Sequence, residues 1–251
     1  GTATISYTRG GCPSMLAVTI NTNPTPITGG TASLCLNAMI AFVDLTPGGT
    51  WSVATPSIGT IDAATGVITG LAVGTTRVSY TLPSGCFVDT VADVNPLPSP
   101  ISGPGTICVG QTVYMTDATA GGVFSASSIG STVDCDSVTG RVRGLSSGTA
   151  MVSYTLLAAP GCSSVMTMTV DPAPTPITGA TTVCIAQSTL LTNSTTGGLW
   201  SSSNMSRATV GSSSGIVTGV TAGAVTITYT TPSGCYVTHL MTVSASPSPI
   251  T

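Results

Sequence analysis

The sequence has no lysine and no glutamate, so its charged side chains are five arginines and eight aspartates, with one histidine, among 251 residues. Without lysine, Schiff-base chemistry, P-loop chemistry and lysine isopeptide cross-links are excluded. A net charge of −3, spread thinly, provides no basic surface for nucleic acid and no polybasic patch for anionic lipid. Apolar residues are scattered and never form the run of about 18 that a membrane span requires. We therefore expect neither a nucleic-acid partner nor a membrane span.

The chain repeats one motif with a period of about 74 residues. The repeat is marked by four equivalent tyrosines, Tyr7, Tyr80, Tyr154 and Tyr229. Three copies are complete, and the expected domains are 28–101, 102–177 and 178–251, preceded by a C-terminal remnant of another copy at 1–27. Because the sequence begins in mid-repeat and shows no signal peptide, we expect a mature segment of a longer secreted protein.

Short segments rich in Val, Ile, Thr and Tyr alternate with Gly, Ser, Pro and Asn clusters, a pattern typical of antiparallel strands and not of helices. Each copy places one aromatic residue, Trp51, Phe124 or Trp200, where a ring would fill the space between two sheets. A ligand-binding ring is the alternative. Proline-rich stretches such as NPTPITG and DPAPTPITG separate the copies, and we expect semi-rigid spacers that also open the first strand of each module.

The succession W-S, A-T-V, S-G-I-V-T-G-V and I-T-Y-T in residues 200–230 resembles the bacterial immunoglobulin-like repeats of the Big2 type. The resemblance extends over essentially the whole chain. It implies an all-β fold of tandem immunoglobulin-like Greek-key β-sandwiches arranged end to end, used as stalk or adhesin modules. The P-x-P-I-T-G linkers, the Ser/Thr richness and the paired cysteines further resemble large secreted surface proteins of Bacteroidota type.

Six of the eight cysteines occur as one pair per repeat, at the same places relative to the flanking motifs. We expect three disulfides, each inside one repeat: Cys35–Cys86, Cys108–Cys162 and Cys184–Cys235. Each would join the opening strand of its module to the final one, and a loop of that length is stabilised by about 4 kcal/mol in the chain-entropy model. Such regular pairing is typical of an oxidising, extracellular compartment.

Two cysteines are left over. Cys12 is equivalent to the second cysteine of each repeat, so its partner is expected upstream or on another chain. Cys135 is expected in a hairpin turn where the other copies carry Ala63 and Ser212. It is either a small turn residue or the site of an intermolecular bridge.

Few residues offer chemistry. His239 stands alone in an alternating strand and is expected to face solvent, so no catalytic residue is predicted. Asp134 and Asp136 form the only close acidic pair, too few oxygens for calcium, and are expected to pair with Arg141 and Arg143. We predict no metal and no cofactor.

The Bacteroidota resemblance implies O-glycosylation at Asp-Ser/Thr-apolar triplets. Two such triplets are present, one centred on Thr90 and the other on Ser137. Both are candidate modification sites.

These observations predict an extracellular structural repeat protein rather than an enzyme. Low charge, stiff linkers and disulfides suit a filament, stalk or adhesin fibre on a bacterial surface, with self-association or neighbouring repeats of the same protein as partners. The alternative is an adhesin module that binds a surface glycan or another ligand through loops at the module ends.

Overall fold

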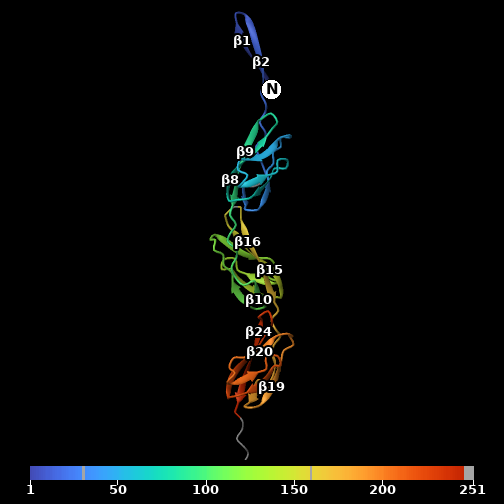
Figure 1. Ribbon diagram of the computed structural model, residues 1–251, viewed down its shortest axis with the longest axis vertical. Coiled ribbons are helices and arrows are strands. Elements are labelled where there is room, and N and C mark those ends of the chain that lie inside the picture. The colour runs from blue at the N-terminus through green and yellow to red at the C-terminus, as the bar shows by residue number, and fades with distance from the viewer. Residues whose placement is uncertain (30–31, 159, 246–251) are drawn as a thin grey trace, which may run out of the picture. The chain divides into compact units, whose positions relative to one another are not determined.

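The computed structural model describes residues 1–29, 32–158 and 160–245 (Figure 1). In that part of the chain every regular element is a strand, and the strands form tandem β-sandwiches, which confirms the predicted all-β class. No helix among the described residues is long and apolar enough to cross a membrane. The last proline-rich stretch, at 246–251, lies outside the described residues.

The first sandwich has two sheets, with strand orders β3-β9-β8-β5 and β4-β7-β6. Its strands are β3 (Ser33–Cys35), β4 (Met39–Ala41), β5 (Thr50–Val53), β6 (Gly59–Ile61), β7 (Val67–Gly70), β8 (Gly74–Thr81) and β9 (Phe87–Asn95). The opening strand β3 runs parallel to the final strand β9, whereas the other pairs are antiparallel.

The second sandwich repeats this topology, with orders β10-β16-β15-β12 and β11-β14-β13. Its strands are β10 (Thr106–Cys108), β11 (Thr112–Tyr114), β12 (Gly122–Ala126), β13 (Val133–Cys135), β14 (Arg141–Gly144), β15 (Gly148–Leu156) and β16 (Ser163–Asp171). Here too the opening strand, β10, runs parallel to the final strand, β16.

The third sandwich has orders β18-β24-β23-β20 and β17-β19-β22-β21. Its strands are β17 (Thr178–Gly179), β18 (Thr182–Cys184), β19 (Ser188–Thr192), β20 (Leu199–Ser202), β21 (Ala208–Val210), β22 (Ile216–Gly219), β23 (Gly223–Thr230) and β24 (Tyr236–Ser244). The extra short strand β17 comes from the proline-rich stretch that precedes the sandwich.

The chain divides into two compact units. One comprises Gly1–Ser99, Ala118–Gly122 and Thr155–Ser164. The other comprises Pro100–Asp117, Val123–Tyr154 and Val165–Thr251. The first unit thus holds the first sandwich with short segments of the second, and the remainder of the second sandwich belongs with the third.

One aromatic pair forms the centre of each core. Trp51, Phe124 and Trp200 are each 7% exposed, and each ring centroid lies 4.8 Å from that of a strand tyrosine. The three pairs are Trp51–Tyr80, Phe124–Tyr154 and Trp200–Tyr229. The predicted filling of the core by these rings is confirmed, because alternation on β8, β15 and β23 turns the tyrosines and their apolar neighbours inward.

The proline-rich stretches belong to the sandwiches they precede. The last proline but one of each stretch, Pro24, Pro98 or Pro174, is buried. The residue after each of them donates its amide to a loop hydroxyl of the following sandwich: Thr25 to Thr46, Ser99 to Thr119 and Thr175 to Thr195. In the third sandwich the stretch continues into β17, which pairs with β19. The equivalent pairings in the first and second sandwiches are the single bridges Thr28↔Val43 and Ser102↔Thr116. The stretch thus opens a first strand in the third sandwich only, whereas in the first and second sandwiches it forms a single bridge.

Residues Thr2–Arg9 (β1) and Cys12–Thr19 (β2) form a separate antiparallel hairpin. Its sequence corresponds to the last two strands of a sandwich, so Tyr7 is the equivalent of Tyr80. Tyr7 is 68% exposed and Tyr80 only 6%. The hairpin sheet has just these two strands among the described residues, so the apolar face that is covered in the sandwiches is uncovered here.

Candidate functional site

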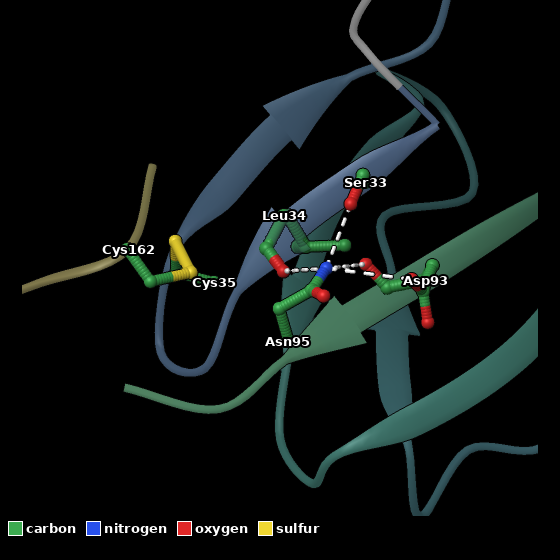
Figure 2. Close-up of a disulfide and its surroundings, with 6 residues drawn as sticks. All are labelled: Ser33, Leu34, Cys35, Asp93, Asn95 and Cys162. Atoms are coloured by element: carbon green, nitrogen blue, oxygen red, sulfur yellow. Dashed lines mark hydrogen bonds between the residues drawn. A yellow bond between two sulfur atoms is a disulfide. The ribbon is translucent and has the colours of Figure 1, made fainter. Parts of the chain in front are cut away.

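Two disulfides join sandwiches to one another. Cys35 is bonded to Cys162 with a Cα–Cα distance of 5.5 Å (Figure 2), and Cys108 is bonded to Cys235 with a distance of 5.6 Å. Both close a sequence separation of 127 residues. In each bond, the cysteine that ends the opening strand of one sandwich is linked to the cysteine that precedes the final strand of the next.

The predicted pairing within each repeat is therefore wrong. Cys35, Cys108, Cys162 and Cys235 are bonded to a neighbouring sandwich, and Cys86 and Cys184, which were expected in disulfides, are free thiols.

Strand register gives the physical reason. In the parallel pair β3–β9, Cys35 lies opposite Asn95, whereas Cys86 precedes the other end of β9. Asn95 lies nine positions after Cys86, which is about 30 Å along an extended strand at roughly 3.3 Å per residue, and a disulfide requires Cα atoms within about 7 Å. The two cysteines of one sandwich therefore lie at opposite ends of it.

The same register recurs in the other two sandwiches. Cys108 lies opposite Asp171, nine positions after Cys162, and Cys184 lies opposite Ser244, nine positions after Cys235. A cysteine at each end of every sandwich is thus a property of the repeat, and it suits bonds between successive sandwiches.

The end of the opening strand is fixed by an amide network, which Figure 2 shows beside the first disulfide. Asn95 donates from Nδ2 to the hydroxyl of Ser33 at 2.7 Å and to the carbonyl of Leu34 at 3.4 Å. Leu34 is only 2% exposed. These contacts anchor β3 on β9, and they hold Cys35 in place for its bond with Cys162.

Cys135 lies in strand β13, not in a turn, so the predicted turn position is wrong. Its register partner is Val142, and its equivalents in the other sandwiches are Ile61 and Val210, which pack against the cores. Burial, and then the nearby charges of Asp134 and Asp136, raise the pKa of the Cys135 thiol. A half-buried, protonated thiol is a weak nucleophile, so Cys135 acts here as a small apolar residue.

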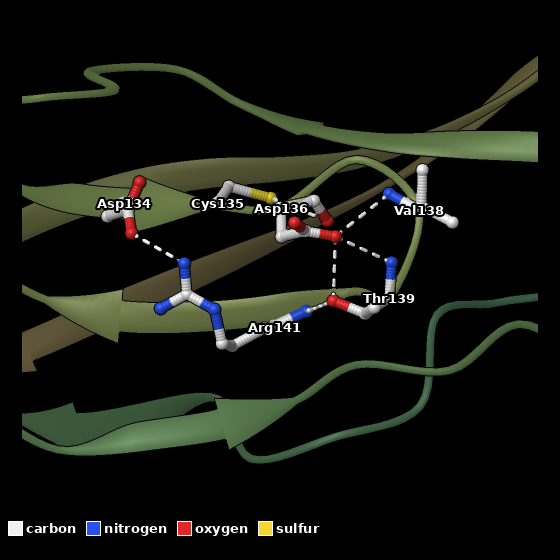
Figure 3. A network of polar contacts seen from close by, with 6 residues as sticks. All are labelled: Asp134, Cys135, Asp136, Val138, Thr139 and Arg141. Carbon is white, nitrogen blue, oxygen red and sulfur yellow. Dashed lines mark hydrogen bonds and ion pairs between the residues drawn. The ribbon is translucent and has the colours of Figure 1, made fainter.

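The acidic pair beside it has two separate roles (Figure 3). Asp134 forms an ion pair with Arg141 at 2.8 Å, which confirms that predicted contact, and Arg143 lies opposite Asp134 in the strand pairing. Asp136 instead accepts hydrogen bonds from the turn at Val138 and Thr139. The described residues include no group of three or more His, Cys, Asp or Glu side chains that could hold a metal ion.

His239 is half-buried on β24, on the side of the strand that also carries the buried residues Met241 and Val243. The expected solvent-facing position is therefore wrong. Its Nε2 lies 3.2 Å from the carbonyl oxygen of Ala180, to which it donates. Nothing in this arrangement positions the ring against a nucleophile.

The two predicted glycosylation residues differ in access. Thr90 is half-buried within β9, whereas Ser137 is exposed in the turn between β13 and β14. Ser137 is therefore the better placed of the two for an enzyme that modifies folded protein.

A hollow lies at one end of the third sandwich, where the alternative prediction places a ligand site. Hydroxyl residues of the loop at Asn193–Gly198 and of the turn at Ser213 and Ser214 line it. Its aromatic residues, Trp200 and Tyr229, are only 7% and 4% exposed. The hollow therefore offers hydroxyl groups to a sugar but no open ring on which a sugar could stack.

Comparison with known proteins identifies the fold of one region. Residues 164–236 match the bacterial Ig-like domain, group 2. The bacterial Ig-like match begins in β16 and ends at the first residue of β24, so it includes most of the third sandwich, and it confirms the Big2 resemblance for that region.

Among solved structures, the chain is similar to mouse cadherin-23 EC22–24, with 14% identity, a TM-score of 0.26 and coverage of 90% of this chain and 99% of that one. It is also similar to Drosophila N-cadherin EC1–4 (11%, TM-score 0.28, coverage 98% and 83%). A third is the surface layer protein SbsC, domains 1–6 (16%, TM-score 0.26, coverage 94% and 42%). No curated protein sequence matches. At these TM-scores the likenesses carry no argument about function.

Proposed function

We propose that this chain is a structural segment of an extracellular array that forms part of a filament, stalk or adhesin fibre on a bacterial surface. Its repeats are residues 28–101, 102–177 and 178–251, and residues 1–27 are the end of a further repeat. The observation that carries the proposal is that each disulfide joins two successive sandwiches and none closes on its own sandwich.

Such bonds suit a load-bearing chain. Each closes a loop of 127 residues. In the chain-entropy model a disulfide across such a loop lowers the entropy of the unfolded chain and so stabilises the folded state by about 5 kcal/mol. The two loops overlap between Cys108 and Cys162, so the three sandwiches form one cross-linked series. Disulfides of this kind persist in oxidising compartments, which supports an extracellular location.

The surface chemistry supports durability outside the cell. The sequence has no lysine and five arginines, and one of these, Arg141, is held by Asp134 at 2.8 Å. Proteases that cleave after basic residues therefore find few sites. Neighbouring repeats of the same protein are the proposed partners, and Ser137 and, less readily, Thr90 are proposed O-glycosylation sites within a Bacteroidota-type host.

Immunogold electron microscopy of intact, unpermeabilised cells tests the proposal, with antibodies raised against this chain. We expect gold on extended structures outside the cell, and peptide mapping of the same material without reductant should recover Cys35–Cys162 and Cys108–Cys235. Label confined to the cell interior, with Cys35 and Cys108 as free thiols, would overturn the proposal.

A further inference from the structure

The outer face of the sheet β11-β14-β13 in the second sandwich carries both charge and an exposed aromatic ring. Its central strand, β14, has two arginines, Arg141 and Arg143, on the side that faces away from the core. Tyr114 of β11 lies opposite Arg141, and the residues opposite Arg143 come from β11 and β13. Directly opposed residues of an antiparallel pair share a face, so five side chains form one surface. This surface, the Arg–Tyr face, consists of Thr112, Tyr114, Asp134, Arg141 and Arg143.

The equivalent faces of the other two sandwiches carry no charged residue at these five positions. In the first sandwich the strand register places there Met39, Ala41, Thr60, Val67 and Thr69. In the third it places there Ser188, Leu190, Thr209, Ile216 and Thr218. The whole chain has only five arginines, and two of them lie on this one face. Since the same sheet forms in all three sandwiches, the fold does not require these arginines or the tyrosine.

The two arginines differ in what holds them. Arg141 donates to Asp134 at 2.8 Å, and Figure 3 shows the two side chains pointing toward one another. The Arg143 side chain is exposed and has no ion pair or hydrogen bond with any residue that the structure describes. Asp134 therefore neutralises one guanidinium of the face, and the other keeps its N–H donors available for a ligand.

The tyrosine of the face is open to solvent. Tyr114 is 63% exposed, whereas Tyr154, which fills the core of the same sandwich, is 6% exposed. An exposed tyrosine offers an apolar ring together with a polar hydroxyl group. Tyrosine and arginine are also among the side chains that are enriched at binding surfaces. A free guanidinium beside an open ring therefore favours a ligand that has an anionic group and an apolar face.

A sugar unit with a carboxylate group has both features. A guanidinium binds a carboxylate through two parallel hydrogen bonds, and the tyrosine ring suits the C–H face of a pyranose. The hydroxyl of Thr112 and the carboxylate of Asp134 can accept hydrogen bonds from sugar hydroxyls. Asp134 on the face and Asp136 just beyond β13 would repel a densely charged partner, such as polyphosphate or a run of acidic side chains. Well-separated single charges, as on a polysaccharide, fit the face better.

We propose that the Arg–Tyr face binds an extracellular polysaccharide that carries carboxylate groups on its sugar units. Arg143 binds the carboxylate, Tyr114 packs against the sugar ring, and Arg141 stays paired with Asp134. This site lies on a sheet face of the second sandwich and not at a module end. It adds a binding activity to the proposed structural role, which does not depend on it.

Binding of the whole chain to immobilised hyaluronate and polygalacturonate, measured by biolayer interferometry, tests the site. We expect saturable binding to at least one of these polymers and none to its methyl ester, which lacks the charge. Arg143→Thr should weaken binding about tenfold or more, because it removes charge-assisted hydrogen bonds. Tyr114→Leu should weaken it about fivefold through loss of the ring. Both changes introduce the residue that the third sandwich carries at that position, so we expect the sandwich to stay folded.

The matched control is Arg77→Thr in the first sandwich. It removes the same charge from an exposed arginine, whose side chain is 65% exposed, and the third sandwich carries Thr226 at the equivalent position. Binding by this variant should stay within about twofold of the unsubstituted chain, because its arginine lies outside the Arg–Tyr face. An unchanged denaturant midpoint in each variant shows that the fold is kept.

Four results would overturn the inference. Neither polysaccharide binds, or the methyl ester binds as tightly as the acid. Arg77→Thr weakens binding as much as Arg143→Thr, which would show attraction to charge in general. Polyaspartate binds as tightly as the polysaccharides, which would identify an acidic protein segment as the partner instead.

Discussion

At the scale of single residues, the second glycine of the G-G-aromatic motif makes room for the core tyrosine. A Cβ on Gly49 would lie 2.4 Å from Cζ of Tyr80, and one on Gly198 would lie 2.5 Å from Cζ of Tyr229. The amide of Gly49 also donates to the Tyr80 hydroxyl at 2.9 Å. This hydroxyl in turn donates to the carbonyl of Thr46. Because Gly49 has no side chain, the buried Tyr80 hydroxyl can lie against its amide and keep both hydrogen bonds.

We therefore expect Gly49→Ala to destabilise the first sandwich by about 1–3 kcal/mol, because the new methyl group displaces a packed ring. Denaturant unfolding followed by Trp51 fluorescence, in a Trp200→Phe background, measures the change. Gly105→Ala in the second sandwich is the control, since its Cβ would meet only Cε of Met166 at 3.8 Å, and its effect is followed by hydrogen exchange of the β15 amides, with the β8 amides measured in the same way for Gly49→Ala. Equal effects of the two substitutions would contradict this explanation.

Sequence reasoning succeeded at residues whose role is set by alternation and failed at one set by alignment. The sequence predicts the buried rings of Trp51, Phe124 and Trp200 because an inward position recurs at a fixed register in each copy. Alignment of the copies predicts Cys135 in the turn, whereas Cys135 ends β13 and the turn begins at the next residue, Asp136. Asp136 is the equivalent of Asp62 in the first sandwich, and the longer preceding loop of the second sandwich conceals that match in sequence.

At the scale of elements, one hairpin recurs in every sandwich, formed by β6–β7, β13–β14 or β21–β22. An aspartate carboxylate stabilises its turn in the first two sandwiches but not in the third. Hydrogen bonds from the hydroxyl and then the amide of Thr65 lower the pKa of Asp62. Bonds from the amide and then the hydroxyl of Thr139 lower that of Asp136. In the third sandwich Gly211 takes this position, and the amide of Ser214 donates to its carbonyl instead.

A lowered pKa in the folded state means that the stabilisation is complete above the unfolded value, about 3.9 for aspartate, and is lost as the pH falls through the lower folded value. Between pH 5 and pH 2 we expect amide protection at Thr65 and Thr139 to fall several-fold. Protection at Ser214 should not change, because its acceptor does not titrate. Hydrogen exchange measured by NMR, relative to intrinsic rates at each pH, checks this. A parallel loss at Ser214 would show general acid unfolding instead.

At the scale of the whole molecule, the staggered disulfides set how far the chain can be stretched. The shortest covalent path runs from residue 1 to Cys35, across to Cys162, back to Cys108, across to Cys235 and on to residue 251. It contains about 104 backbone links instead of 250, or about 370 Å instead of about 900 Å at full extension.

Single-molecule stretching from the two termini should therefore reach about 370 Å for the oxidised chain and about 900 Å after reduction. The double variant Cys35→Ser/Cys108→Ser should reach the longer value without reductant. The double variant Cys86→Ser/Cys184→Ser should stay at the shorter one. If this second variant lengthens the chain, the cysteines pair within their own repeats and the staggered arrangement is wrong.

The pairing of the cysteines could not be predicted from the sequence, although the strands could. The cysteines recur at equal spacing in every repeat. The spacing is equally regular whether each first cysteine bonds the second cysteine of its own repeat or that of the next repeat, so it cannot distinguish the two pairings. The choice depends on β3 running parallel to β9, which brings Cys35 beside Asn95 and away from Cys86. That pairing joins segments about 60 residues apart and leaves no local signature.

The overlap of the two disulfide loops also makes the chain tolerant of cleavage. A break at any one peptide bond between Cys35 and Cys235 leaves both fragments joined, because one of the two bridges always crosses it. The proline-rich stretches at 96–101 and 172–177, which connect successive sandwiches, both lie inside a loop. With bonds confined to single repeats, one cut in either stretch would release everything beyond it. Here a protease would have to cut outside Cys35–Cys235 to shorten the chain.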